Sequence, residues 1–487
     1  MSSTDMYGGR GKKPDTAAVE GTRLAPSGTV DDPRLVEASL TRRALLDFIS
    51  RQRWFRSKAR TLIDAKLVDI GLLGAGGFMA VVAVTFEDGG VDRYAFAGGG
   101  EGALLRMLLT GGSLPMRTGR VEATTLGAAD PGFAADDVGQ GAPDQSNTSI
   151  VFGSAYIMKM FRKLEVGVNP DVEIGRFLSA RGFTRVPPLA AAAEYVAEDG
   201  SRSSILMLQE LVPNQGNAWD FTLAALRPDA AQGFAPSPEY LAFANRLGQR
   251  TGELHVALAS DPDEPDFAPE SCSRRDLAVL SNRMREYGSA QIDLLQSASQ
   301  PLHPNARQDA ADVFDARMQL LDRFKHLERV QHPGFQIRCH GDYHLGQTLV
   351  ADGDFIILDF EGEPARSLAE RRAKSSPLRD VAGMVRSFGY AASAGLKASP
   401  RAAAPGAFAG LERWERAVRG AFIDGYLSAA ADGGFLPPRR QDFETMLEAF
   451  VLEKALYELG YELNNRPDWV GVPLAALKRL AAGERVS

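Results

Sequence analysis

The spacing of apolar residues divides the chain into a first part rich in strands and a second part rich in helices. Up to residue 211, short segments of alternating apolar residues are separated by glycine-containing turns, a pattern typical of antiparallel strands. From residues 237–239, which read Ser-Pro-Glu, apolar residues recur at helical spacing. This order predicts an α+β fold in which a short linker near residues 212–216 joins a sheet-rich lobe to a largely helical lobe.

A few segments depart from the dominant pattern of each part. A helix is predicted from Pro170, and its first turn carries acidic residues that favour the positive end of a helix. Residues 191–196 and 203–211 predict a hairpin that turns at Asp199–Gly200. In the helical part, a long helix is predicted over residues 307–327. Short strands are also predicted there, at residues 335–340, 347–350 and 355–360.

Composition and element order divide the chain into four regions. Residues 1–32 are rich in Gly, Ser, Thr, Asp and Pro and are predicted to be a disordered extension. Residues 33–133 predict an N-terminal α+β cap subdomain, residues 134–214 the sheet-rich lobe and residues 215–487 the helical lobe. A cleft between two such lobes is a common place for a ligand.

Charge and composition exclude several classes of function. The 487 residues include 55 Lys and Arg against 62 Asp and Glu, a net charge of −7, which disfavours nucleic-acid binding. No apolar run approaches the ~18 residues of a membrane helix, and no signal-peptide core is visible. Cys272 and Cys339 lack metal-ligand spacing and are expected to be reduced. We therefore expect a cytoplasmic protein that binds neither nucleic acid nor membrane.

The strongest chemical signal is the segment from His340 to Gln347, which is followed by an apolar strand ending at Asp359. Phosphoryl transfer needs a carboxylate that orients the acceptor hydroxyl and takes its proton, and oxygen ligands for Mg²⁺. Asp342, Gln347 and Asp359 have the order and spacing of these groups in protein kinases, although Gln replaces Asn and Asp-Phe-Glu replaces Asp-Phe-Gly. The alternative is a structural hairpin with a buried His340.

Residues of the first part fit the nucleotide side of the same chemistry. Lys159 lies among alternating apolar residues and would face inward with Glu173 as its partner, as Lys and Glu pair in protein kinases; an exposed strand lysine is the alternative. A polar run could cap phosphates with its backbone amides or form an ordinary turn: Gln145, Ser146, Asn147, Thr148 and Ser149. By position alone, adenine would meet the backbone at the end of the last strand: Gln209, Glu210 and Val212.

Several motifs together resemble the bacterial maltokinases. They are residues 145–149, 161–165 with 169–173, 250–255, 340–347, 359–364, 369–374 with 376–381, and 461–464 with 466–469. Residues 51–55 with Lys58 resemble that family's N-terminal cap, so the resemblance runs from about residue 36 to the end. It implies an aminoglycoside-phosphotransferase-like, protein-kinase-like fold. It also implies ATP-dependent phosphorylation of the anomeric hydroxyl of maltose, which feeds α-glucan (glycogen) synthesis and links the protein to trehalose synthase.

The same resemblance implies roles for individual residues. Asp342 would be the catalytic base, Gln347 and Asp359 would hold Mg²⁺, and Lys159 would bind the phosphates of ATP together with the loop at residues 146–149. Polar and aromatic residues near the motifs are candidates for sugar contacts, with helix packing and surface salt bridges as the alternative. They are His344, Glu361, Arg379, Asp380, Tyr390, Tyr457, Glu458 and Tyr461.

The motifs define the reaction better than the sugar. A kinase of another sugar, such as glucosamine, would keep Asp342, Gln347 and Asp359, and its pocket should place a carboxylate beside the amine. A regulatory pseudokinase would have a degraded lysine or metal site, and a hydrolase using Asp342 and Glu361 lacks a supporting nucleophile motif. A monomer and a homodimer are both compatible with the sequence.

Overall fold

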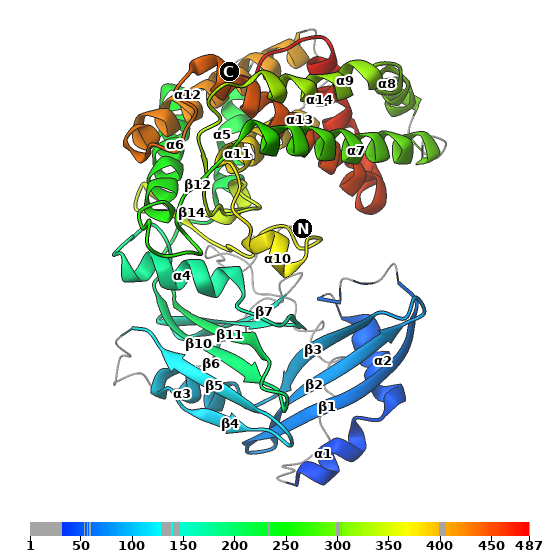
Figure 1. The fold of residues 1–487 in the computed structure, drawn as a ribbon, viewed down its shortest axis with the longest axis vertical. Helices are drawn as coiled ribbons and strands as arrows, with labels where there is room; N and C mark the ends of the chain where they lie inside the picture. Colours follow the sequence, from blue (N-terminus) through cyan, green and yellow to red (C-terminus); the bar gives the residue numbers. More distant parts are fainter. Residues whose placement is uncertain are drawn as a thin grey trace. The chain divides into compact units, whose positions relative to one another are not determined.

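The computed structural model describes the chain from Asp32 onward (Figure 1). Short gaps in that description are residues 53, 56, 58–59, 128–137, 140–146, 232–233, 299–301, 303, 399–405 and 487. The extension predicted for residues 1–32 thus lies almost wholly outside the described residues. The chain forms two compact units, and we call Met1–Gly216 with Ile356–Phe360 the sheet-rich unit. The helical unit comprises Asn217–Phe355 and Glu361–Ser487.

Two antiparallel sheets form most of the sheet-rich unit. The larger has the order β4 (Ser113–Pro115), β5 (Arg120–Thr125), β10 (Leu189–Val196), β11 (Arg202–Glu210), β8 (Tyr156–Phe161), β7 (Asn147–Phe152) and β6 (Val138–Gly139). The smaller has the order β1 (Leu62–Gly74), β2 (Gly77–Phe86), β3 (Val91–Gly98) and β9 (Lys163–Leu164). The predicted hairpin is confirmed, because β10 and β11 pair across the turn at Asp199–Gly200.

Helices cover these sheets, which explains why β2 is almost entirely apolar. Met79 and Val81 on one face of β2 pack with helix α3 (Glu101–Thr110) and the larger sheet. Phe78 and Val82 on the other face pack against α1 (Pro33–Ser39) and α2 (Arg42–Arg51). A strand buried on both faces has no polar alternation. Helix α4 (Pro170–Ala180), predicted from its acidic first turn, packs its Val172 against the larger sheet.

The helical unit is built around long helices in close contact. They are α5 (Ala218–Ala231), α6 (Pro238–Leu258), α7 (Arg274–Ala298), α11 (Leu378–Ala398), α12 (Ala407–Ala430), α13 (Arg440–Asn465) and α14 (Gly471–Ala481). Glycines bring α6 and α12 together: a Cβ on Gly248 would lie 2.0 Å from the carbonyl oxygen of Phe422, and one on Gly425 1.9 Å from that of Asn245. None of the described helices is long and apolar enough to cross a membrane.

Shorter elements of the helical unit differ in part from the prediction. The helix expected over residues 307–327 is divided into α8 (Pro304–Asp315), α9 (Arg317–Arg323) and a 3-10 segment. The remaining elements are α10 (Leu368–Arg372), β12 (Glu270–Ser271), β13 (Phe335–Gln336), β14 (Thr348–Ala351) and β15 (Asp354–Ile357), whose end enters the sheet-rich unit. The strand expected over residues 335–340 stops at Gln336. Ile337 pairs with Ser375 in an isolated bridge, and the backbone N–H groups of His340 and Gly341 donate to the Asp380 side chain.

The described elements thus form a mixed α+β fold with one sheet-rich and one helical unit, as predicted from the element order.

Candidate active site

Three charged side chains from distant segments meet within the sheet-rich unit. Lys159 of β8 places its Nζ 2.9 Å from Asp171 Oδ2 and 2.6 Å from Asp359 Oδ1. Lys159 and Asp171 are both buried, which rules out an exposed strand lysine. A buried ammonium is stable only when carboxylates or other acceptors compensate its charge, so the three groups depend on one another.

Helix α4 gives Lys159 a partner in Asp171, two residues before the Glu173 to which the sequence had pointed. Asn169 caps the helix by accepting the N–H of Asp171, which fixes Asp171 in the first turn. Asp171 Oδ2 accepts from Lys159 and its Oδ1 accepts the N–H of Phe360 at 2.9 Å. Glu173 lies two residues further around the helix and is only half-buried. One carboxylate of α4 therefore holds both the lysine and the segment that carries Asp359.

Asp359 has an unusual backbone conformation that suits a functional position. Its φ is 65°, in the left-handed region that few residues other than glycine adopt. The Asp359 and Asp171 carboxylates come within 4.8 Å of each other. Carboxylate oxygens at this spacing are ligands that Mg²⁺ prefers, and the Lys159 ammonium is complementary to phosphate. These residues therefore fit a bound Mg²⁺·ATP.

The segments predicted to contact the rest of the nucleotide take part in burial, strand pairing and hydrogen bonds within the protein. Asn147 and Ser149 are buried in β7, and Thr148 Oγ1 accepts a 2.9 Å hydrogen bond from Arg162 Nε. Gln145 and Ser146 lie outside the described residues. At the end of β11, Gln209 is paired with its neighbouring strands and Glu210 is exposed. The carbonyl of Val212 accepts from Asn214 Nδ2 at 2.9 Å.

In the helical unit, a buried aspartate holds the predicted catalytic loop through hydrogen bonds to its backbone. Asp380 accepts the N–H of His340 at 2.7 Å and that of Gly341 at 2.9 Å, and lies 3.1 Å from His255 Nε2. Burial would raise the pKa of Asp380, but its hydrogen bond with His255 and the charges of His255 and His340 lower it. Asp380 is also a candidate sugar contact, and its carboxylate anchors the loop that carries Asp342.

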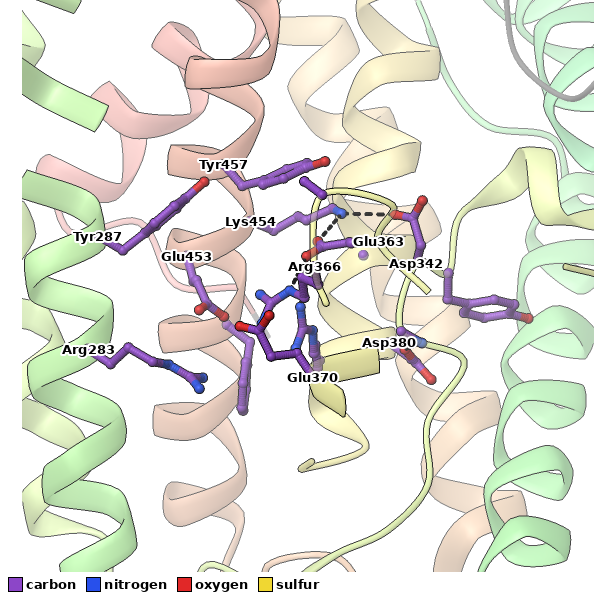
Figure 2. Close-up of a pocket in the computed structure, with 16 residues that line it drawn as sticks. Arg283, Tyr287, Asp342, Glu363, Arg366, Glu370, Asp380, Glu453, Lys454 and Tyr457 are labelled. Atoms are coloured by element: carbon purple, nitrogen blue, oxygen red, sulfur yellow. Dashed lines mark hydrogen bonds and ion pairs between the residues drawn. The ribbon is translucent and has the colours of Figure 1, made fainter. Parts of the chain in front are cut away.

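Asp342 opens onto a cavity of about 270 Å³ in the helical unit (Figure 2). Ligand pockets typically measure about 300–1,000 Å³, so this one suits a small ligand. Most of the wall is charged or aromatic, which suits a polar ligand. It comprises Arg283, Tyr287, Gly341, Asp342, Tyr343, Glu363, Ala365, Arg366, Glu370, Arg379, Asp380, Gly383, Phe450, Glu453, Lys454 and Tyr457.

A lysine and a glutamate that sequence analysis did not assign form the charged centre of this wall. Lys454 of α13 lies 3.2 Å from Asp342 Oδ1 and 3.0 Å from Glu363 Oε1. Glu363 Oε2 accepts from Arg366 at 2.6 Å and from Arg379 at 2.9 Å. Burial would raise the pKa of Glu363, but the charges of Lys454, Arg379 and Arg366 outweigh it and lower the pKa to about 2.

The predicted sugar contacts divide into those that reach the cavity and those that do not. Arg379 and Tyr457 line the wall together with the anchoring Asp380. In the described part of the chain the wall does not include His344, Glu361, Tyr390, Glu458 or Tyr461.

Most of these five residues have other contacts. His344 Nδ1 accepts the N–H of Gly346, Glu458 is buried in an ion pair with Arg386, and Tyr390 donates to Glu462. Tyr461 is 40% exposed and stacks on Tyr457, with ring centroids 6.4 Å apart.

The predicted metal ligand Gln347 is buried in the helical unit, in a short 3-10 helix (Leu345–Gln347). Asp359, its expected co-ligand, belongs to the sheet-rich unit. The shared role of these two residues in holding Mg²⁺ stays a prediction.

Comparisons with known proteins agree with this architecture. No protein-family model matches the chain. It is similar to a glucosamine kinase of Mycolicibacterium smegmatis, with 29% identity over 340 residues that cover 69% of this chain and 78% of that protein. It is also similar to a glucosamine kinase of Streptacidiphilus jiangxiensis, with 26% identity over 347 residues, 69% of this chain and 72% of that protein.

Solved structures share the fold. A glucosamine kinase in complex with glucosamine, ADP and inorganic phosphate matches with a TM-score of 0.62 and 20% identity, covering 89% of this chain and 98% of that chain. Another crystal form of glucosamine kinase matches with a TM-score of 0.62 and 21% identity, over 87% of this chain and 94% of that chain. The chain therefore has the protein-kinase-like fold that its sequence predicted.

Proposed function

We propose that this protein is an ATP- and Mg²⁺-dependent kinase of a small amino sugar such as glucosamine. The observation that carries the proposal is that Asp342, at the catalytic position of a kinase-like loop, opens onto a small cavity rich in carboxylates. Two similar proteins are glucosamine kinases, which favours an amino sugar over the maltose that the sequence motifs had suggested. A solved structure of this fold binds glucosamine and ADP, which supports the same choice of ligands.

The geometry gives each charged group a separate task. Lys159 would bind the phosphates of ATP, and Asp171 and Asp359 would offer oxygen ligands to Mg²⁺, with Gln347 as the further predicted ligand. When bound, Mg²⁺ supplies positive charge that stabilises the transferring phosphoryl group. Asp342 would orient the acceptor hydroxyl and take its proton as the hydroxyl oxygen bonds to the γ-phosphorus. The bond from that phosphorus to the β-phosphate oxygen breaks, and ADP leaves.

Glu453 supports an acceptor that carries an amine. Its side chain lines the cavity and is half-buried, but it makes no hydrogen bond or ion pair with any described residue. The other acids of the wall have partners, since Asp342 and Glu363 contact Lys454, Asp380 anchors the loop, and Glu370 caps its own helix. The charge of Glu453 acts on Arg379, but its oxygens have no hydrogen bond or ion pair in the described residues. A half-buried carboxylate of this kind is suited to a cationic ligand.

A stacked pair of tyrosines favours maltose as the second candidate. Tyr457 lines the cavity, and the ring of Tyr461 stacks beside it. Tyr461 is 40% exposed. Sugars commonly pack on such aromatic faces, and a second glucose unit would lie there. The cavity volume of about 270 Å³ favours the smaller acceptor.

A panel of acceptors tests the proposal. ADP release should be measured with Mg²⁺·ATP and, in turn, glucosamine, N-acetylglucosamine, glucose and maltose, and we expect the highest kcat/KM with glucosamine. Preference for maltose would replace the amino-sugar assignment while keeping the phosphotransferase. No ADP release above background with any sugar would contradict both assignments.

A substitution of the carboxylate without a partner sharpens this test. Glu453→Gln should lower kcat/KM for glucosamine about ten- to a hundredfold and leave glucose within about threefold, because a charge-assisted hydrogen bond is worth about 1.5–3 kcal/mol. Glu444→Gln is the matched control, since Glu444 lies on the same helix in an ion pair with Arg440 and outside the cavity wall. Equal losses for both sugars in Glu453→Gln would contradict amine recognition.

A further inference from the structure

Arg162 lies where the chain passes from the larger sheet to the smaller one. It is the single residue between β8, which ends at Phe161, and β9, which begins at Lys163. Its carbonyl oxygen accepts the N–H of Ala95 in β3 at 2.8 Å, and its Nη1 donates to the carbonyl oxygen of Ala95 at 3.3 Å. Arg162 is therefore bound to the smaller sheet through both its backbone and its side chain.

The side chain of Arg162 is a buried cation that contacts uncharged groups in the described part of the chain. Its guanidinium carbon lies 5.4 Å from the ring centroid of Trp54, and its Nη1 lies 3.1 Å from Met160 Sδ. Its Nε donates to Thr148 Oγ1 at 2.9 Å, and its Nη2 donates to the same oxygen. A buried charge is costly unless several polar groups compensate it, so these contacts hold one another in place.

Thr148 connects this cation to the predicted phosphate loop. It is the second residue of β7, which begins within the predicted loop of residues 145–149. The next residue, Ser149, pairs with Lys159 on the neighbouring strand. Because successive side chains of a strand point to opposite faces of the sheet, Thr148 lies on the face opposite to Lys159. Arg162 therefore supports β7 from the face that is remote from the proposed nucleotide site.

We propose that Arg162 is a positioning residue through which the smaller sheet holds β7 and the predicted phosphate loop in place for the nucleotide. This inference rests on the nucleotide part of the proposed function. It also gives a role to residues 51–55, the segment that resembles the maltokinase cap, because that segment contributes Trp54. A strand that is already held in its bound position loses less conformational freedom on binding, so its ligand binds more tightly.

Substitutions on both sides of the hydrogen bond between Arg162 and Thr148 test this role. Calorimetry measures the binding of a non-hydrolysable Mg²⁺·ATP analogue in the absence of sugar. Arg162→Met and Thr148→Val should each raise Kd about three- to tenfold, which is the effect of one lost hydrogen bond. Thr148→Ser keeps the hydroxyl and should bind the analogue as wild type does. An unchanged Kd in either Arg162→Met or Thr148→Val would overturn the inference.

The double variant shows whether Arg162 acts through Thr148. If it does, the variant that carries both Arg162→Met and Thr148→Val should bind the analogue as weakly as either single variant, because the second substitution removes an interaction that is already lost. Losses that multiply would mean that the two residues act separately, and would contradict the inference.

Arg60→Met is the matched control. Arg60 also lies over an aromatic ring, 3.7 Å from the centroid of Phe86, and its ion pair with Asp88 measures 2.7 Å. These contacts lie within the smaller sheet and its turns, so Kd for the analogue should stay within about twofold of wild type. Circular dichroism with thermal melting shows whether each variant is folded at the temperature of the measurement. A loss in Arg60→Met equal to that in Arg162→Met would contradict a specific role for Arg162.

Measuring nucleotide binding without sugar separates this inference from the choice of acceptor. Weaker binding of the analogue in Arg162→Met supports the inference even if no tested sugar is phosphorylated, in which case the acceptor assignment fails alone. Equal binding by wild type and Arg162→Met overturns the inference even if the sugar kinase activity is confirmed. If wild type does not bind the Mg²⁺·ATP analogue, both the inference and the proposed kinase are wrong.

Discussion

At the scale of single residues, the site depends on carboxylates that differ in what surrounds them. Asp380 is fully buried and accepts hydrogen bonds from backbone N–H groups, whereas Asp342 is partly exposed and opens onto the cavity. Glu453 faces the same cavity and makes no hydrogen bond or ion pair with a described residue. Their surroundings therefore distinguish a structural acid from the proposed catalytic base and from the proposed amine contact, although all three are carboxyl groups of the same unit.

Asp342→Ala should abolish phosphoryl transfer without unfolding the protein. General-base catalysis contributes about 10²–10⁴-fold, and the side chain makes few structural contacts beyond its ion pair with Lys454. Steady-state ADP release measures the loss, and circular dichroism with thermal melting checks the fold. Turnover within tenfold of wild type would refute the catalytic assignment.

At the scale of secondary-structure elements, two kinds of contact hold the helical unit together. Partly buried ion pairs join α13 to the segment that follows Asp359, through Lys454, Glu363 and Arg366. Glycine contacts join α6 to α12, where Gly248 and Gly425 let the two backbones approach closely. The strength of the ion pairs depends on pH, whereas the glycine contacts depend on side-chain volume. The two kinds of contact therefore predict different effects on stability.

Glu363 should make the stability of the protein depend on pH in the acid range. Its pKa falls from the usual 4.5 to about 2 in the folded state, because nearby cations outweigh its burial. The stabilisation is therefore complete above about pH 4.5 and is lost as the pH falls toward 2, and it amounts to about 3 kcal/mol at about 1.36 kcal/mol per unit. Urea unfolding of wild type and Glu363→Gln across this range measures it. The difference between them should shrink toward pH 2, and a difference independent of pH would contradict the linkage.

Gly248→Ala should destabilise the helical unit by about 2–3 kcal/mol or more. A Cβ at this position would lie 2.0 Å from the Phe422 carbonyl oxygen, so the two helices must move apart. Gly420→Ala on α12 is the control, since no atom lies within 4 Å of the Cβ it would add, and we expect it to be neutral or slightly stabilising. Chemical denaturation compares the two variants, and equal stability would mean that the close approach of α6 and α12 has little energetic weight.

At the scale of the whole molecule, the candidate chemistry is divided between two compact units. Lys159, Asp171 and Asp359 belong to the sheet-rich unit, whereas Asp342 and the cavity belong to the helical unit. The chain supplies the sheet-rich unit with Asp359 by returning to it for only five residues, Ile356–Phe360. This division predicts that the nucleotide and the sugar bind to different parts of the chain.

Hydrogen exchange should reveal this division. A non-hydrolysable Mg²⁺·ATP analogue should slow exchange mainly in β7, β8, the start of α4 and residues 356–360, and glucosamine mainly in residues 340–347 and α13. Saturating ligand should slow the affected amides by about tenfold or more, because binding at a hundred times Kd stabilises the native state by about 2.7 kcal/mol. Mass spectrometry of peptic fragments localises the effect. Protection of the helical unit alone by the nucleotide would contradict the assignment of Lys159 and Asp359.

The sequence by itself determined the order of elements and the α+β fold, and it made Lys159, Asp342 and Asp359 candidates, because these follow from local periodicity and from short motifs whose spacing is fixed along the chain. Only the tertiary structure placed Asp171 beside Lys159, Asp380 beneath the loop, and Lys454 and Glu453 in the cavity wall. Lys454 is 112 residues from Asp342. Whether two such side chains meet depends on how apolar helix faces pack, and that packing is a property of the whole fold and leaves no local pattern.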